Sequence, residues 1–272
     1  MNKNNNSYII AYAAILVIVV AAALSFAALK LKSRQAENVR MERMSDILRS
    51  IGQGGDADKA ADKIAYINEQ YKKYITDSYA VNTEGDVVKG ADAFNILLNL
   101  KAEYDKPEDQ RELPIFVSRD DAGKPLYVIP VWGSGSCGPI WAYVGLESDR
   151  DTIYGVVFAH KSETPGLGAE ITTSWFQDNF KGKKIFNQDE LVSISVMKGG
   201  ADPYDPYSVD AVSGGTITSR SVENMLKRDL TGYAAYFRKM RAGQDNQAVS
   251  PDAENGPQPA VDSTIVNNAG HE

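Results

Sequence analysis

The chain has 272 residues, of which 43% are hydrophobic, so it can form one sizeable folded domain with additional segments. Its net charge of −7 and its pI near 5.0 argue against nucleic acid as a partner, and no cluster of Lys and Arg with interleaved aromatic residues reverses that conclusion. Cys137 is the only cysteine, which excludes a disulfide framework or a cysteine-based metal site within the chain.

A transmembrane helix is predicted close to the N-terminus, after a short tail of residues 1–7. Residues 8–29 form an uncharged and almost wholly apolar run that is long enough, at 1.5 Å per residue, to cross a hydrocarbon core of about 30 Å. A cleaved signal peptide is the alternative, because Ser25-Phe-Ala27 resembles a cleavage site, but the apolar region of a signal peptide has only about 7–15 residues. We therefore expect a single-span membrane anchor.

The charges that flank this span bear on its orientation. Four basic residues follow the span, whereas only Lys3 and the amino terminus precede it; the four are Lys30, Lys32, Arg34 and Arg40. Taken alone, the positive-inside tendency places the large domain in the cytoplasm.

The rest of the chain divides by composition. Residues 30–75 carry apolar residues at helical spacing and are predicted to be a helical stalk or packing segment, and residues 76–242 are predicted to form the main domain. Beyond residue 242, Gly, Asn, Gln, Pro, Asp and Glu dominate, so residues 243–272 are predicted to be a disordered tail.

Four β-rich segments follow a charged predicted loop over residues 101–112. They are separated by short turns rich in Gly, Asp and Ser, and they cover residues 113–118, 125–132, 140–147 and 152–159. Connections this short leave no room for crossover helices, so the strands must be antiparallel. The predicted fold class is therefore α+β, an antiparallel sheet flanked by helices, with one N-terminal transmembrane helix.

The stretch Asp210-Ala-Val-Ser-Gly-Gly-Thr216 lies where a β-compatible run changes to a helical one. A helix start offers free N–H groups and a favourable dipole to a phosphate, and Gly214 and Gly215 let the backbone approach it. Thr216 would lie beside that phosphate, whereas Thr218 would already lie within the first helical turn. The alternative is that Ser213 or Thr216 is an ordinary N-cap.

A second motif, Glu163-Thr164-Pro-Gly-Leu167-Gly168, follows a predicted strand and precedes a predicted helix over residues 172–180. Read alone, Thr-Pro-Gly is turn chemistry and Glu163 is a solvated acid. The Gly133–Gly138 loop resembles a phosphate cradle, but no Gly-Lys-Thr/Ser follows, so a hairpin turn is the better interpretation. Cys137 in that loop is interpreted as incidental, and neither histidine has a second one nearby for a metal site.

Two of these motifs resemble a known family. The Asp210 to Thr216 stretch resembles the flavinylation motif Asp-x-x-Ser-Gly-Ala-Thr of the FMN-binding domains in sodium-pumping NADH:quinone reductases and the related Rnf complexes, with Gly215 in place of the alanine. Glu-Thr-Pro-Gly-Leu-Gly is a signature of the same domains, and the run from Tyr127 to Gly135 resembles the C subunit of the sodium pump. The resemblance covers about residues 8–240.

The resemblance implies a membrane flavoprotein with FMN linked covalently to Thr216 by an FMN transferase, and with no catalytic residue or metal of its own. The FMN-binding residues would be Thr216 with its neighbours in the two motifs, namely Asp210, Ser213, Gly214, Gly215, Thr218, Glu163, Thr164, Leu167 and Gly168. The chain would relay electrons from NADH toward ubiquinone among the other subunits of an Na+-transporting complex of the bacterial inner membrane.

The resemblance also places the soluble domain on the periplasmic side, against the flanking charges. NADH would be oxidised on another subunit, because no Gly-x-Gly-x-x-Gly fingerprint appears in a βαβ context. Two alternatives remain, the equivalent covalent-FMN subunit of an Rnf-type ferredoxin:NAD+ oxidoreductase and a membrane-anchored structural or binding domain without redox function.

Overall fold

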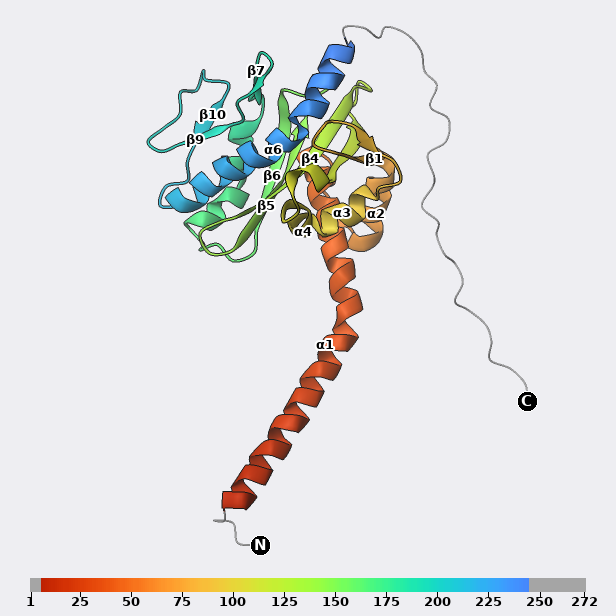
Figure 1. Cartoon of the computed structure of the whole chain (residues 1–272), viewed down its shortest axis with the longest axis vertical. Helices are drawn as coiled ribbons and strands as arrows, with labels where there is room; N and C mark the ends of the chain where they lie inside the picture. Colours follow the sequence, from red (N-terminus) through yellow and green to blue (C-terminus); the bar gives the residue numbers. More distant parts are fainter. Residues whose placement is uncertain (1–5, 245–272) are drawn as a thin grey trace, which may run out of the picture.

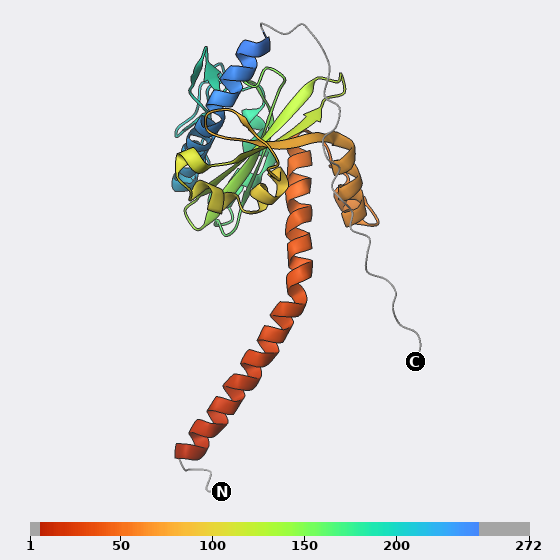
Figure 2. The same ribbon diagram turned by 45° about the vertical axis from the view of Figure 1, so that its right-hand side comes forward.

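A computed structural model of the chain describes residues 6–244 and begins with one long helix. Helix α1 (Asn6–Ser50) is unbroken for 45 residues and projects from the folded domain (Figures 1 and 2). From Tyr8 onward the helix includes a stretch that is apolar enough and long enough to cross a membrane, and none of its most apolar part is buried against the domain. At its other end Ile47, Leu48 and Ile51 are at most 1% exposed. One helix thus joins the predicted membrane anchor to the core of the domain.

The core of the domain is a six-stranded antiparallel sheet with the order β2-β1-β3-β4-β5-β6. Its strands are β1 (Ile75–Val81), β2 (Val87–Val88), β3 (Leu113–Arg119), β4 (Pro125–Ser134), β5 (Pro139–Leu146) and β6 (Ile153–His160). The four strands expected between residues 113 and 159 are all present, and short turns join them as an antiparallel meander. The α+β prediction is confirmed.

Helix α6 (Thr216–Gln244) covers one face of this sheet. Six of its apolar residues at helical spacing are at most 2% exposed, and they are Val222, Met225, Leu226, Leu230, Tyr233 and Phe237. The buried stripe ends before Met240, which is 37% exposed. The helix therefore stays fixed on the sheet along most of its length.

The opposite face is covered by α1 together with α2 (Lys63–Tyr74), α3 (Ala93–Leu98) and α4 (Leu100–Tyr104). Strand residues alternate between the two faces, so Phe116, Val128 and Tyr143 pack on this side while Ile115 and Ile129 pack under α6. The domain is thus a three-layer arrangement of helix, sheet and helices.

The end of α1 is seated in a notch in the sheet. Gly145 and Gly155 face each other on β5 and β6. A methyl group added at Gly145 would lie 2.6 Å from the Ser50 carbonyl oxygen, and one added at Gly155 would lie 2.7 Å from it. The absence of a side chain at both positions lets the last turn of α1 contact the sheet backbone directly.

Two predicted segments differ from the structure. The expected loop over residues 101–112 contains α4 and a 3-10 turn, η2 (Glu108–Gln110), because the buried Glu103 carboxylate accepts hydrogen bonds from Glu112 N–H and Lys106 and folds the segment on itself. The expected helix over residues 172–180 is three short turns, η3 (Gly168–Thr172), α5 (Ser174–Gln177) and η4 (Asp178–Phe180), because Thr173 is extended and its hydroxyl donates to Glu170 O.

Two small sheets complete the domain. Strands β7 (Phe186–Asn187) and β8 (Glu190–Leu191) are antiparallel, and β9 (Ser195–Met197) and β10 (Ser208–Asp210) are parallel. Strand β10 leads directly to the turn before α6, so this small parallel pair sets where α6 begins.

Candidate functional site

The turn before α6 packs tightly against the loop of residues 163–168. Gly214 has φ +74°, and a methyl group added there would lie 2.7 Å from Leu167 Cδ2. One added at Gly215 would lie 3.0 Å from Val212 Cγ1 and 3.3 Å from Leu167 O. The two motifs therefore meet in space although Leu167 and Gly214 are 47 residues apart in the sequence, and the glycines are needed for that contact.

The hydroxyl groups around the start of α6 fall into two classes. Thr218 and Ser219 are at most 2% exposed: the Thr218 hydroxyl donates to Glu163 at 2.7 Å, and the Ser219 hydroxyl accepts from Val212 N–H at 3.0 Å. Ser213 and Thr216 are exposed, and neither side chain has a hydrogen-bond partner in the part of the chain that the structure describes. The alternative that one of them is an ordinary N-cap therefore finds no support in this geometry.

Thr216 is the first residue of α6, so its surroundings include unpaired backbone donors. The first helical bond described here runs from Ser219 N–H to Gly215 O at 2.8 Å. The N–H groups of Thr216, Ile217 and Thr218 precede it and have no intrahelical acceptor. An exposed hydroxyl beside such donors is a suitable place for a phosphate ester, since these groups can bind its free oxygens.

Glu163 is buried and connects three segments. It is 5% exposed, and it accepts from the Thr218 hydroxyl through Oε2 and from Cys137 N–H through Oε1, at 2.7 and 2.8 Å. The alternative interpretation of Glu163 as a solvated acid is therefore wrong. A motif that resembles a polar turn can bury this carboxylate because a backbone amide and a hydroxyl group replace the hydrogen bonds that water would otherwise donate to it.

The other predicted residues are placed differently around this centre. Thr164 and Leu167 are exposed, with Leu167 at 43%, and Thr164 Oγ1 lies 3.8 Å from the Cys137 sulfur. Gly168 is buried against Glu163 and Thr218. Asp210 does not join the group, because its carboxylate accepts from Ala201 N–H and organises the loop between β9 and β10.

Sequence reasoning missed the contribution of the β4–β5 hairpin. Gly135 packs on Glu163, and Cys137 contributes its main-chain N–H to that carboxylate. No side-chain pattern signals a backbone donor, and Gly135 reads as an ordinary turn residue. Within residues 6–244, no group of three or more His, Cys, Asp or Glu could hold a metal ion.

A buried acid lies further along α6. Asp229 is fully buried, accepts from Trp132 N–H at 2.7 Å and is paired with Arg228 at 2.6 Å. Burial raises the pKa of Asp229 to about 6, against the opposing effect of Arg228. Asp46 on α1 is similar, since burial raises its pKa to about 6 as well.

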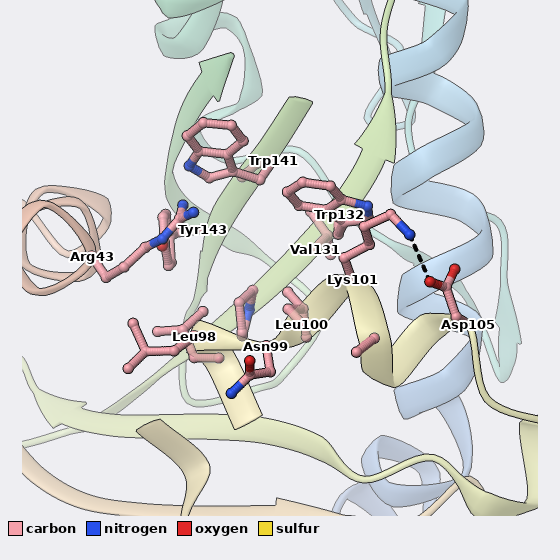
Figure 3. Close-up of a pocket in the computed structure, with 14 residues that line it drawn as sticks. Arg43, Leu98, Asn99, Leu100, Lys101, Asp105, Val131, Trp132, Trp141 and Tyr143 are labelled. Carbon is pink, nitrogen blue, oxygen red and sulfur yellow. Dashed lines mark hydrogen bonds and ion pairs between the residues drawn. The ribbon is translucent and has the colours of Figure 1, made fainter. Parts of the chain in front are cut away.

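A groove of about 340 Å³ lies on the other face of the sheet, between α1 and α3–α4 (Figure 3). Trp132 and Trp141 stack there with their ring centres 6.0 Å apart, and the Arg43 guanidinium lies 4.5 Å from the Trp141 ring. None of the predicted site residues lines this groove. We therefore assign the candidate site to the start of α6.

Comparison with known proteins identifies the family. A model of the FMN-binding domain matches residues 135–231, which include the turn between β4 and β5, strand β5, the Glu163 loop and Thr216. The crystal structure of the C subunit of Na(+)-translocating NADH-quinone reductase from Parabacteroides distasonis is 38% identical, with a TM-score of 0.65, covering 76% of this chain and 96% of that chain. The chain belongs to this family, the C subunits (NqrC) of Na(+)-translocating NADH-quinone reductases.

Two further relatives agree with this family. The C subunit from Vibrio alginolyticus is 28% identical over 234 residues, which are 82% of this chain and 90% of the relative. The Shewanella oneidensis NqrC structure is 25% identical, with a TM-score of 0.62, and is covered over 98% of its length by 75% of this chain. The predicted resemblance to the NqrC family is confirmed, and the apolar start of α1 is that of a membrane-anchored subunit.

Proposed function

We propose that this chain is the FMN-carrying C subunit of an Na(+)-translocating NADH-quinone reductase, with FMN joined through its phosphate to Thr216. The observation that carries the proposal is the state of the Thr216 hydroxyl. It is exposed at the start of α6 and has no hydrogen-bond partner among residues 6–244, whereas the nearby Thr218 and Ser219 hydroxyls are buried and hydrogen-bonded. The matched FMN-binding domain includes this residue.

The residues present fit an FMN group at this position. The free N–H groups of the first turn of α6 would hold the phosphate oxygens, and the exposed side chains of Thr164 and Leu167 would contact the rest of the cofactor. When bound, FMN supplies the electron-transfer chemistry, while the protein supplies position and surroundings. The chain would thus relay electrons between other subunits, from NADH toward the quinone, in a complex that couples this transfer to Na+ transport.

The proposal includes a single membrane span and an external domain. The apolar part of α1 would cross the inner membrane once, and the domain would lie on the periplasmic side, where an FMN transferase would reach Thr216. Alkaline phosphatase fused after Met240 should then be active. An inactive phosphatase, together with an active cytoplasmic reporter at the same site, would place the domain in the cytoplasm.

Thr216→Val tests the attachment site, because valine keeps the size and β-branching of threonine but lacks the hydroxyl. After co-expression with the transferase, the variant should fold but show no in-gel flavin fluorescence, and peptide mass spectrometry should find FMN only on Thr216 of the parent. Ser213→Ala is the control, since Ser213 is also exposed but is not the proposed attachment residue, so covalent FMN should remain on this variant. FMN on Thr216→Val, or a mass shift at Thr218, would contradict the assignment.

The same preparations distinguish the alternatives. The named relatives are pump subunits, which favours the pump over an Rnf-type complex, and the matched FMN-binding domain disfavours a structural domain without cofactor. Identification of the subunits that co-purify with the chain separates pump from Rnf. A colourless, non-fluorescent protein after co-expression with an active transferase would favour the structural domain.

A further inference from the structure

We propose that Glu163 is a positioning residue for flavin attachment, which holds the first turn of α6 so that the Thr216 hydroxyl faces outward. The inference rests on the proposed function, and it assigns Glu163 and Thr218 a role different from contact with FMN. Their side chains are 5% and 1% exposed and are bonded to each other, so neither is available to a cofactor at the surface.

The helical geometry connects Thr218 to Thr216. Successive residues of an α-helix are about 100° apart around the axis, so residues two apart point in nearly opposite directions. Glu163 fixes Thr218 toward the interior through the 2.7 Å hydrogen bond, and Thr216 is consequently directed to solvent, where it is found exposed. Loss of this bond would free Thr218 from the Glu163 loop, while the packing of Leu167 on Gly214 and the hydrogen bond from Val212 N–H to the Ser219 hydroxyl would remain.

The carboxylate also links the turn to the β4–β5 hairpin. Its second oxygen accepts from Cys137 N–H at 2.8 Å, so one side chain joins the hairpin, its own loop and α6. Gly135 and Gly168 make room for it, because a methyl group at Gly135 would overlap Oε1 and one at Gly168 would overlap Oε2 and the Thr218 hydroxyl. Three separate segments are thus built around this carboxylate.

The chemistry of the contacts indicates that the geometry of Glu163 matters and its charge does not. A carboxylate close to a phosphate site would repel the phosphate, so a phosphate-binding role is unfavourable. Both partners are neutral groups, an amide N–H and a hydroxyl. A glutamine can replace both bonds, since its oxygen accepts from Cys137 N–H and its NH₂ donates to the Thr218 oxygen.

The test measures FMN transfer to purified full-length chain, in detergent, expressed without transferase and then supplied with transferase and a flavin dinucleotide as donor. The Thr216 oxygen forms the new bond to the FMN phosphorus and loses its proton, while the pyrophosphate bond of the donor breaks and the nucleoside monophosphate leaves. Glu163→Gln and Thr218→Ser should be modified at nearly the parental rate. Thr218→Val should be slowed about tenfold at saturating transferase, as expected from the loss of one buried hydrogen bond, and Glu163→Ala, which also removes the Cys137 contact, should be slowed at least as much. Neither should change the transferase concentration at half-maximal rate. The double variant Glu163→Ala/Thr218→Val should be no slower than Glu163→Ala, because that substitution already removes the contact with Thr218.

Each remaining outcome is decisive. If Glu163→Gln is as slow as Glu163→Ala, the charge is needed and the positioning role is wrong; if Thr218→Val is modified at the parental rate, the contact is unnecessary. Additive effects in the double variant would show that Glu163 acts independently of Thr218. Circular dichroism checks that each variant is folded. If Glu163→Ala does not fold, the comparison of Thr218→Val with Thr218→Ser decides alone. A parent that accepts no FMN overturns the proposed function and this inference together.

Discussion

The pH dependence of folding should report on Asp229, which is fully buried at the interface of α6 and β4. Its pKa is raised from 3.8 to about 6, which at 1.36 kcal/mol per pKa unit means that the fold favours protonated over ionised Asp229 by about 3 kcal/mol. Because the folded state favours the protonated form of Asp229, the stabilisation that it contributes is complete below the pKa of Asp229 in the unfolded chain. This stabilisation is lost as the pH rises through about 6. We therefore expect Asp229 to weaken the folded state by about 2 kcal/mol between about pH 4.5 and about pH 8.

Asp229→Asn removes this titration. The free energy of unfolding of both proteins is measured in detergent by urea titration and tryptophan fluorescence at the two pH values. Effects of the substitution that do not depend on pH cancel in the difference between the two conditions, and Asp46, with its own pKa raised to about 6, is present in both proteins. Relative to Asp229→Asn, the parent should lose about 2 kcal/mol at the higher pH. Parallel profiles for the two proteins would show that Arg228 keeps Asp229 ionised in the fold and would refute the reasoning.

Three further outcomes follow from the packing and the composition. Gly85→Ala should lower the free energy of unfolding more than Gly123→Ala does in denaturant titrations. Both glycines have φ near +80°, but a methyl group at Gly85 would lie 2.5 Å from Tyr236 N, whereas Gly123 faces open space. Equal losses would show that the backbone angle alone matters. Gly155→Ala should lower the free energy of unfolding by about 1–3 kcal/mol through overlap with the Ser50 carbonyl, measured in the same way, and an unchanged value would mean that α1 shifts freely. Truncation after Ala242 removes the predicted disordered tail, residues 243–272, nearly all of which lies outside the described residues. It should leave FMN attachment intact by in-gel fluorescence, because a composition this poor in apolar residues is not expected to form part of a folded core, and loss of flavin would make the tail part of the domain.

Much of the fold could be predicted because its signals are local. Strands β3 to β6 carry long apolar runs between turn residues, and α6 repeats apolar residues such as Val222 and Leu226 near the helical period. The segment over residues 168–180 could not be predicted in the same way. Phe176 and Phe180 have helical spacing, but both are buried against Phe158, and Thr173 interrupts the helix.

The candidate site was predictable as two motifs but not as an arrangement. The motifs name Thr216 and the Glu163 loop, and the structure brings them together through the contact between Leu167 and Gly214. The burial of Glu163 has no local signal, because its partners are a main-chain amide 26 residues earlier and a hydroxyl 55 residues later. Such long-range satisfaction of a polar group depends on the tertiary fold, which a single sequence does not display.

The continuity of α1 with the core limits how the domain can move above the membrane. Only about 11 residues separate Leu29 from Met41, the first buried residue of α1, and they form a continuous helical spacer of about 17 Å. A flexible tether would let the domain sample many heights and orientations, as a carrier that travels between distant partners requires. Here any tilt of the helix turns the domain with it, because Ser50 is seated between Gly145 and Gly155. In the proposed function, partners that exchange electrons with this domain would therefore have to come within reach at a nearly constant height, or would have to move the helix itself.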